Sequence, residues 1–157
     1  MALMPKLQLG DDAPQFSLPD QDGRVVSSSQ FKGSKVLVYF YPKDDTPGCT
    51  KEACQFNENL QAFQQAKVPV IGISADSAAS HVKFRNKHGL QFPLLTDSSR
   101  QVMEQFGAYG QKMMYGKPVT GVIRSTFLIG ADGKIEQAWY SVKADGHAAK
   151  VLEGLRA

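Results

Sequence analysis

Two apolar runs constrain the fold of this chain more than any other feature of its sequence. The first, KVLVYFY, covers residues 35–41, and the second, VPVIGIS, covers residues 68–74. The first is an unbroken series of β-branched and aromatic residues, which is typical of a strand buried on both faces. The second run predicts another buried strand. Together they indicate the central parallel or mixed sheet of an α/β protein.

The segments around these runs supply further elements. The spacing of apolar residues and turn signals predicts helices at residues 49–66, 76–88, 99–106 and 145–155. Turn signals at Asp22-Gly23 and Asp132-Gly133 predict hairpins, the first near the N-terminus and the second between strands at residues 122–129 and 134–140. The glycine-flanked residues 110–121 are expected to form a loop. This order of elements predicts a thioredoxin-like fold, with a central mixed sheet flanked by helices and an N-terminal β-hairpin extension.

Length and charge exclude several classes of protein. A chain of 157 residues fits one domain, residues 1–157, and buries roughly 70% of its unfolded surface, so it needs no disulfide or metal to fold. A net charge of +3 without a block of five like charges argues against nucleic acid and acidic membranes as partners. No segment has the length of a signal-peptide core or a membrane span. Two cysteines in such a domain indicate a reducing compartment, by default the cytoplasm.

Both cysteines lie in the stretch PKDDTPGCTKEAC, residues 42–54. The letters TPGC predict a helix start, with Thr46 as N-cap, Pro47 at the first helical position and Cys49 in the first turn. The positive end of the helix dipole and free backbone N–H groups then favour the thiolate of Cys49. An ordinary capped helix would give the same local pattern. The place of the stretch, directly after a buried strand, favours a functional site.

Cys54 lies too far along the predicted helix for a disulfide with Cys49. On a regular helix the two Cα atoms are roughly 8.7 Å apart and their side chains point to different faces. A metal site is also disfavoured, because no further Cys and no nearby His completes a tetrahedral set. Two alternatives remain at this point. Either Cys54 is a buried apolar filler, or the helix must open before this thiol can act.

The same stretch resembles the active-site signature of the peroxiredoxins, Pro-x-x-x-Thr/Ser-x-x-Cys, at Pro42, Thr46 and Cys49. The wider string YFYPKDDTPGCTKEAC is similar to the bacterioferritin comigratory protein, or peroxiredoxin Q, subfamily. That subfamily often carries its resolving cysteine five residues after the peroxidatic one, which is the position of Cys54. The later string RSTFLIGADGKI also matches, and it supplies the family's arginine as Arg124. The resemblance covers nearly the whole chain.

The resemblance implies a thiol-dependent peroxidase. Cys49 attacks hydrogen peroxide or an alkyl hydroperoxide and becomes a sulfenic acid, and Cys54 condenses with it to an intramolecular disulfide. Thioredoxin or a similar dithiol then reduces this bond. The resemblance also implies a monomer without metal, haem or flavin. The rivals are a thiol-disulfide reductase or redox sensor without peroxidase turnover, and a non-catalytic binding domain. Ser125-Thr126 stand where thioredoxins have a cis-proline before Thr, which disfavours a thioredoxin-type dithiol role.

Peroxide reduction needs more than an ionised thiol. An ordinary cysteine is about 3% thiolate at pH 7, so complete ionisation gains only about thirtyfold. The resemblance therefore gives roles to groups that bind the peroxide: the Thr46 hydroxyl and the backbone N–H groups of Gly48 and Cys49. Pro42 would shield the sulfur from water. Simpler roles are open for two of them, since Thr46 could be only a cap and Pro42 only the end of a strand.

Two charged residues complete the expected site. Arg124 can stabilise the thiolate and the negative charge that develops as the O–O bond breaks. Glu52, one helical turn beyond Cys49, resembles the family's acidic residue that orients this arginine. The alternatives are a surface strand residue for Arg124 and a solvated charge for Glu52.

Other candidate residues are interpreted as structural or left open. The spacing of His81 and His88 on one helix, roughly 10.5 Å along its axis, is too large for a shared metal ion, and His147 is isolated. The neighbouring pair Asp44-Asp45 would oppose a thiolate, so both are expected to be solvated loop residues. The role of Met113-Met114, in the glycine-flanked loop, is not decided by the sequence.

Overall fold

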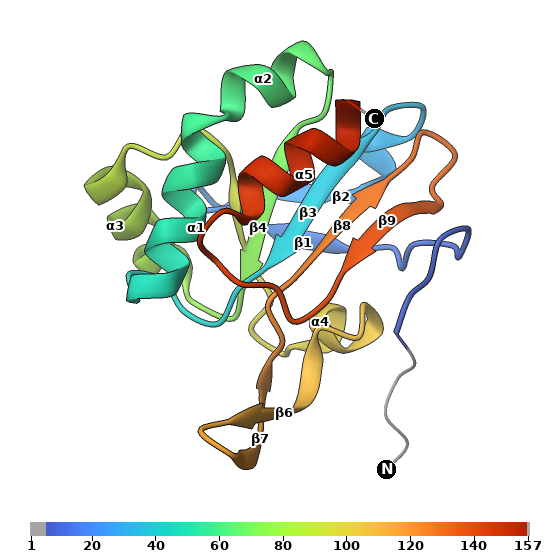
Figure 1. The fold of residues 1–157 in the computed structure, drawn as a ribbon. Coiled ribbons are helices and arrows are strands. Elements are labelled where there is room, and N and C mark those ends of the chain that lie inside the picture. The colour runs from blue at the N-terminus through green and yellow to red at the C-terminus, as the bar shows by residue number, and fades with distance from the viewer. Residues whose placement is uncertain (1–5, 157) are drawn as a thin grey trace.

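The structure is a computed structural model that describes residues 6–156, with side chains to residue 155. Its centre is a five-stranded mixed sheet in the order β5-β4-β3-β8-β9 (Figure 1). The strands are β3 (Val36–Phe40), β4 (Val70–Ser74), β5 (Leu94–Thr96), β8 (Ser125–Ile129) and β9 (Ile135–Trp139). β3 pairs in parallel with β4 and antiparallel with β8. The predicted central mixed sheet is therefore confirmed.

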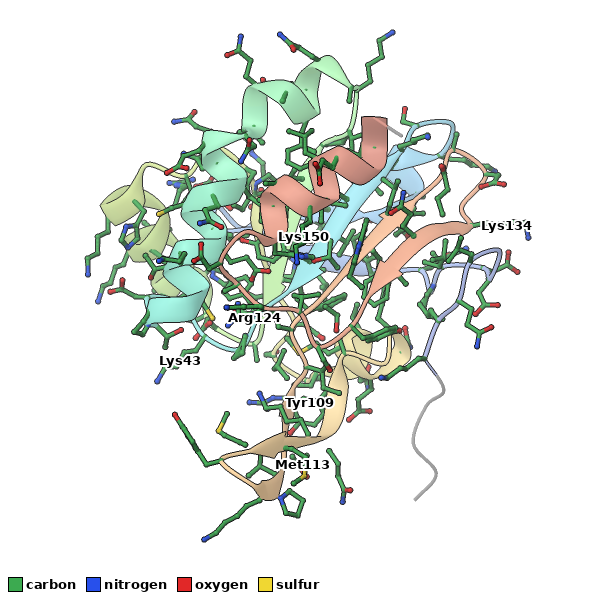
Figure 2. The ribbon with its side chains drawn as sticks, in the orientation of Figure 1. Lys43, Tyr109, Met113, Arg124, Lys134 and Lys150 are labelled. Carbon is green, nitrogen blue, oxygen red and sulfur yellow. The ribbon has the colours of Figure 1, made fainter. Side chains whose placement is uncertain are left out.

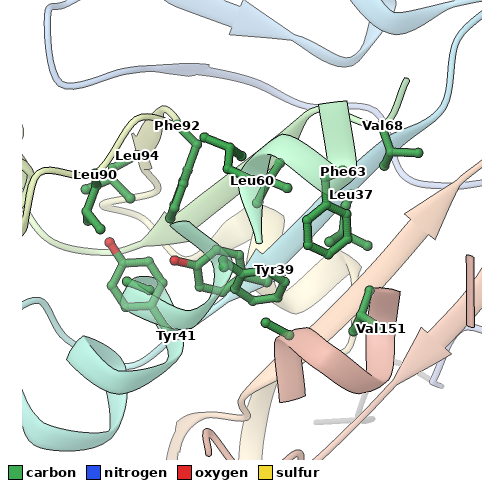
Figure 3. Packing of buried hydrophobic residues seen from close by; sticks show 14 of the residues in the cluster. Leu37, Tyr39, Tyr41, Leu60, Phe63, Val68, Leu90, Phe92, Leu94 and Val151 are labelled. Atoms are coloured by element: carbon green, nitrogen blue, oxygen red, sulfur yellow. The ribbon is translucent and has the colours of Figure 1, made fainter. Parts of the chain in front are cut away.

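Alternate residues of β3 point to opposite faces of the sheet and enter two separate cores. Leu37, Tyr39 and the following Tyr41 pack with side chains of the helices α1 (Pro47–Glu58), α2 (Leu60–Gln65), α3 (Ala78–His88) and α5 (His147–Arg156). Figure 3 shows this core, in which Tyr39 and Tyr41 lie beside Phe92 and Leu90. Val38 and Phe40 enter the second core, with α4 (Gln101–Gln105) and Phe16. A strand covered on both faces explains the apolar run without alternation.

The predicted helices are present, with shifted ends. The helix predicted from apolar spacing at residues 49–66 begins at Pro47, the first helical position that TPGC predicts, and it is divided at Asn59, whose ψ of 6° interrupts the helix between α1 and α2. The last helix begins at His147 rather than at residue 145. α3 begins after Ser77, whose side chain accepts a hydrogen bond from the Ser80 N–H, and it ends at Gly89 with a left-handed φ of 63°.

The N-terminal hairpin is confirmed as β1 (Ser17–Pro19) paired antiparallel with β2 (Val25–Ser27), and a 3-10 helix, η1 (Ser28–Phe31), follows. Among residues 6–156, no helix has the length and apolar character that a membrane span requires.

The loop expected at residues 110–121 is instead an additional hairpin, β6 (Tyr109–Met114) and β7 (Lys117–Val122). It projects from the body of the molecule as a separate two-stranded ribbon (Figure 1). Its turn residues, Tyr115 and Gly116, both have positive φ, 52° and 78°, as a type I′ turn requires. The sequence did not indicate this turn, because Tyr rarely takes the position that Asn or Asp usually fills. The undecided pair Met113-Met114 lies on the exposed end of the ribbon.

Candidate active site

Cys49 lies in the first turn of α1, in the loop-to-helix segment that follows the carboxyl end of β3. Thr46 has the extended backbone of an N-cap residue, with φ −91° and ψ 156°, and Pro47 occupies the first helical position, as predicted. The Cys49 side chain is buried at 2% exposure, and neither cysteine forms a disulfide. Its sulfur therefore lies at the positive end of the helix dipole with little competing water.

The Thr46 hydroxyl differs from the predicted cap. It makes no bond to an N–H group of α1, and it donates a hydrogen bond to the Lys43 carbonyl at 2.8 Å. Because its hydrogen is committed to that carbonyl, the oxygen is left as an acceptor for a ligand. The N–H groups of Gly48 and Cys49 lie in the first turn, where helices leave donors without an intrahelical acceptor.

Strand register brings Arg124 to the sulfur across 75 residues of sequence. In the antiparallel β3–β8 pair, Phe40 at the end of β3 faces Ser125 at the start of β8. The segment that follows β3 and the residue that precedes β8, Arg124, therefore lie at the same edge of the sheet. The Arg124 Nη2 group lies 3.4 Å from Cys49 Sγ, and its Nη1 group donates to Glu52 Oε1 at 2.6 Å. Figure 2 shows Arg124 beside the start of α1. Arg124 thus links the Cys49 sulfur to a carboxylate on the same helix.

Glu52 is fully buried, so the alternative of a solvated surface charge is wrong. Its Oε1 atom is paired with Arg124, whereas its Oε2 atom has no hydrogen-bond partner among the residues that the structure describes. Burial raises the pKa of Glu52 to about 7, although the Arg124 charge acts in the opposite direction. Burial also lowers the pKa of Arg124, but the charges of Glu52 and Cys49 outweigh it and raise this pKa above its ordinary value. Arg124 therefore remains a cation.

Gly48 has a steric role that the sequence did not indicate. A Cβ atom at this position would lie 3.2 Å from Arg124 Nη2, closer than most real Cβ contacts. The guanidinium reaches the sulfur because residue 48 has no side chain. The motif TPGC thus contains the space for the arginine as well as the helix start.

Comparison with known proteins agrees with this geometry. Residues 9–138 match the model of the AhpC/TSA family. The chain belongs to this family and is a peroxiredoxin. Peroxiredoxin Bcp of Escherichia coli is 48% identical over 153 residues, which cover 98% of each chain. A putative peroxiredoxin of Mycobacterium tuberculosis is 53% identical over 150 residues, which cover 96% of each chain.

Solved structures of similar proteins have the same fold. The bacterioferritin comigratory protein of Xanthomonas campestris superposes with a TM-score of 0.84 at 40% identity, covering 90% of each chain. A mutant of Xylella fastidiosa PrxQ superposes with a TM-score of 0.90 at 37% identity, covering 97% of each chain. These relatives support a thiol-dependent peroxidase activity and confirm the thioredoxin-like fold of this peroxiredoxin.

Cys54 lies on α1 like Cys49, but it is only half-buried. Burial, together with the charge of Glu58, raises the pKa of the Cys54 thiol, so this thiol is neutral at pH 7. The next residue, Gln55, donates to Asp145 Oδ1 and accepts from the Gly146 N–H, each at 2.8 Å. In this reduced peroxiredoxin, the residue after Cys54 is therefore hydrogen-bonded to the segment that precedes α5, and these bonds hold α1 in place there.

Asp44 is the main correction to the expected site. Its side chain is 3% exposed, so the expectation of a solvated loop residue is wrong. The predicted exposure holds for Asp45, which pairs with Lys87 and His88. This difference could not be predicted from the local sequence, because the partners of Asp44 include α3 residues 36 and 37 positions away.

The remaining predictions for the site concern Pro42, His147 and metal binding. Pro42 is half-buried at the end of β3, and its shielding role stays a prediction. His147 is buried, with Nε2 at 2.7 Å from the Thr126 hydroxyl, and burial lowers its pKa to about 4. His147 is therefore neutral at pH 7. No group of three or more His, Cys, Asp or Glu residues within the described part of the peroxiredoxin could hold a metal ion.

Proposed function

We propose that this chain reduces hydrogen peroxide and alkyl hydroperoxides with Cys49 as the peroxidatic thiolate. The contact that carries the proposal is the 3.4 Å approach of Arg124 Nη2 to the buried Cys49 sulfur, with Glu52 holding the other arm of the guanidinium. A cation fixed beside a sulfur at a helix N-terminus favours the thiolate, which is the nucleophile in such chemistry. The alkyl peroxide reduction activity of the Xanthomonas campestris relative supports the substrate class.

In the peroxide step, the thiolate of Cys49 attacks one oxygen of the O–O bond. An S–O bond forms, the O–O bond breaks, and the leaving oxygen takes a proton to become water or an alcohol, while the sulfur is oxidised to sulfenic acid. The Thr46 oxygen accepts a hydrogen bond from the peroxide hydroxyl. The Arg124 guanidinium and the N–H groups of Gly48 and Cys49 donate toward the oxygens as negative charge develops. These interactions strengthen in the transition state, which is what accelerates the reaction.

In the second step, Cys54 condenses with the sulfenic acid, releases water and leaves an intramolecular disulfide. Both thiols lie on α1, so the turns between them must open before the sulfurs can bond. A dithiol protein, for which we propose thioredoxin in the cytoplasm, then reduces the disulfide of the monomeric enzyme.

The test is a coupled assay in which peroxide consumption is measured against oxidation of thioredoxin by the purified protein. We expect turnover that requires both substrates. The rival function, a thiol-disulfide reductase or sensor, would instead give reduction of a protein disulfide such as insulin without peroxide. That result would refute the proposal.

A further inference from the structure

A buried polar cluster holds the loop that precedes the peroxidatic cysteine, and the proposed mechanism does not use it. Asp44 lies at its centre and accepts three hydrogen bonds. The donors are the Tyr41 hydroxyl at 2.6 Å, the Ser80 hydroxyl at 2.8 Å and His81 Nδ1 at 2.7 Å. Tyr41 follows β3, whereas Ser80 and His81 belong to α3. The Asp44 side chain therefore joins the end of the central strand to a helix.

His81 has no contact with solvent, and both of its ring nitrogens face oxygen acceptors. Nδ1 faces the Asp44 carboxylate, and Nε2 lies 3.1 Å from the Leu95 carbonyl. The two contacts fix the orientation of the imidazole ring from opposite sides. The ring in turn holds the Asp44 carboxylate against α3.

The backbone of Asp44 is fixed as firmly as its side chain. Its N–H group donates to Asp76 Oδ2 at 2.8 Å, and the Ser74 hydroxyl donates to the same oxygen at 2.7 Å. The Asp44 N–H and the Lys43 carbonyl are the two ends of one planar peptide group. The Lys43 carbonyl is the acceptor that holds the Thr46 hydroxyl at 2.8 Å. Fixing one end of this peptide therefore fixes the direction of the other.

We propose that Asp44, His81 and Asp76 are positioning residues that orient the Thr46 hydroxyl for peroxide. Asp76 sets the tilt of the peptide between Lys43 and Asp44, and His81 holds the side chain of Asp44 against α3. The Thr46 oxygen then presents its lone pairs to the peroxide and not to the helix. This inference rests on the proposed peroxidase function and adds residues that do not touch the substrate.

The experiment compares two reactions of one thiol, in a Cys54→Ser background so that only Cys49 reacts. The first reaction is single-turnover oxidation by hydrogen peroxide, followed by mass spectrometry of the sulfenic acid. The second is alkylation by iodoacetamide, which needs the thiolate but no oriented hydroxyl. We expect Asp44→Asn to slow the peroxide reaction by roughly 10- to 100-fold, since small displacements of a binding group cost this much, and to change alkylation by less than about threefold.

The neighbouring aspartate provides a matched control. Asp45→Asn removes the same charge from the adjacent residue and from contacts with the same helix, but these contacts are exposed. Asn also tolerates the left-handed backbone of residue 45, whose φ is 59°. We expect less than a twofold effect on either reaction. Equal losses in peroxide rate for the two variants would overturn the proposal.

A double-mutant cycle with Thr46→Val separates orientation from general stability. If Asp44 acts through the Thr46 hydroxyl, Asp44→Asn should have little further effect on the peroxide rate once that hydroxyl is gone. The same fold-loss in both backgrounds, or a parallel fall of peroxide and alkylation rates, would mean that Asp44 only maintains the fold.

If Asp44→Asn does not fold, Ser80→Ala is the second variant that tests the role of Asp44. It removes one of the three hydrogen bonds to Asp44 in a helix that accommodates alanine, and we expect a loss of a few-fold confined to the peroxide reaction. No loss in a folded Ser80→Ala protein would count against the proposal. A Thr46→Val protein with unchanged peroxide rate would refute the positioning role and leave the Cys49 chemistry in place. Loss of that chemistry is tested separately by Cys49→Ser.

Discussion

The two segments that meet at Cys49 are held in different ways. The loop before it, residues 42–46, is hydrogen-bonded by side chains from the residue after β3, from the segment after β4 and from α3. The turns after it, residues 49–54, depend on helical hydrogen bonds and on the pair between Glu52 and Arg124. The difference matches the two demands of the proposed mechanism. Peroxide binding needs fixed groups, whereas disulfide formation needs a segment that can move.

The turns between the cysteines contain a feature that favours their opening. Glu52 is fully buried, and within residues 6–156 its Oε2 atom has no hydrogen-bond partner, which is costly for a carboxylate. Opening the helix transfers this group to water and removes that cost. Ala53, also fully buried, opposes opening through its packing. The hydrogen bonds of Gln55 to Asp145 and Gly146 mark where the movable part ends.

The largest expected effect comes from the residue at the junction of the two segments. Cys49→Ser should abolish peroxide reduction, because a serine hydroxyl does not ionise enough to act as the nucleophile. Peroxide consumption under saturating reductant measures this. A Cys54→Ser variant is the matched control, since it should keep the first oxidation and lose only recycling through the intramolecular disulfide. Substantial turnover by Cys49→Ser would show that Cys49 is not the nucleophile, and the two segments around it would then have no common role in catalysis.

Arg124→Ala should give the next largest effect, a fall of roughly 10²- to 10³-fold in the rate of peroxide attack. The rate must be measured at a pH at which the thiolate absorbance shows Cys49 fully ionised in both proteins. The expected loss remains there, because Arg124 also stabilises the charge that develops on the leaving oxygen. If the two rates coincide under these conditions, Arg124 acts only through ionisation.

Oxidation should open the helical turns after Cys49, residues 49–54, and leave the loop before it, residues 42–46, unchanged. We expect a Cys49–Cys54 disulfide with amide exchange that is roughly 10-fold or more faster around residues 49–56 in the oxidised protein. Trypsin cleavage after Lys51 should leave two peptides joined only by this bond. The amides of residues 42–46 serve as the internal reference. Intermolecular disulfides alone, or the same exchange in both redox states, would contradict a movable helix start.

The smallest expected effect is a pH dependence from Glu52. Its pKa in the folded helix, about 7, lies above the ordinary 4.5, so the folded helix binds the proton more tightly than the opened one. This stabilisation is complete below pH 4.5 and is lost as pH rises through 7. Between pH 6 and pH 8, opening of the first turns in the reduced protein should increase about tenfold beyond the intrinsic change in exchange.

The control for this pH effect is Glu52→Gln, which keeps the shape of the side chain and removes its titration. Its corrected exchange rates should not change between the two pH values. A pH dependence that persists in Glu52→Gln would assign the effect to another group.

Features carried by local pattern could be predicted, and those set by distant packing could not. The apolar run at residues 35–41 predicted the central strand, because a strand covered on both faces has no polar side. The signature at Pro42, Thr46 and Cys49 and its distant Arg124 followed from a family resemblance. The β6–β7 ribbon was missed, because Tyr115-Gly116 forms a turn that Asn-Gly usually makes.

The burial of Asp44 shows the same limit more sharply. Asp44 and Asp45 are the same residue type in one loop, so residue type alone does not predict which of them is buried. The left-handed backbone of Asp45 turns the two side chains to different surroundings, and α3 supplies partners for both. Only the position of that helix decides which carboxylate is buried.

The antiparallel register of β3 with β8 also determines which changes of length the active site tolerates. The distance from Cys49 to Arg124 depends on this pairing and not on the length of the chain between the two residues, so residues added to or removed from the β6–β7 ribbon leave it unchanged. A slip of β8 by a single residue is different, since it moves the arginine by about 3.4 Å along the strand and turns alternate side chains to the opposite face. The active site therefore tolerates insertions and deletions in the β6–β7 ribbon, whereas it requires that the register between β3 and β8 stay the same.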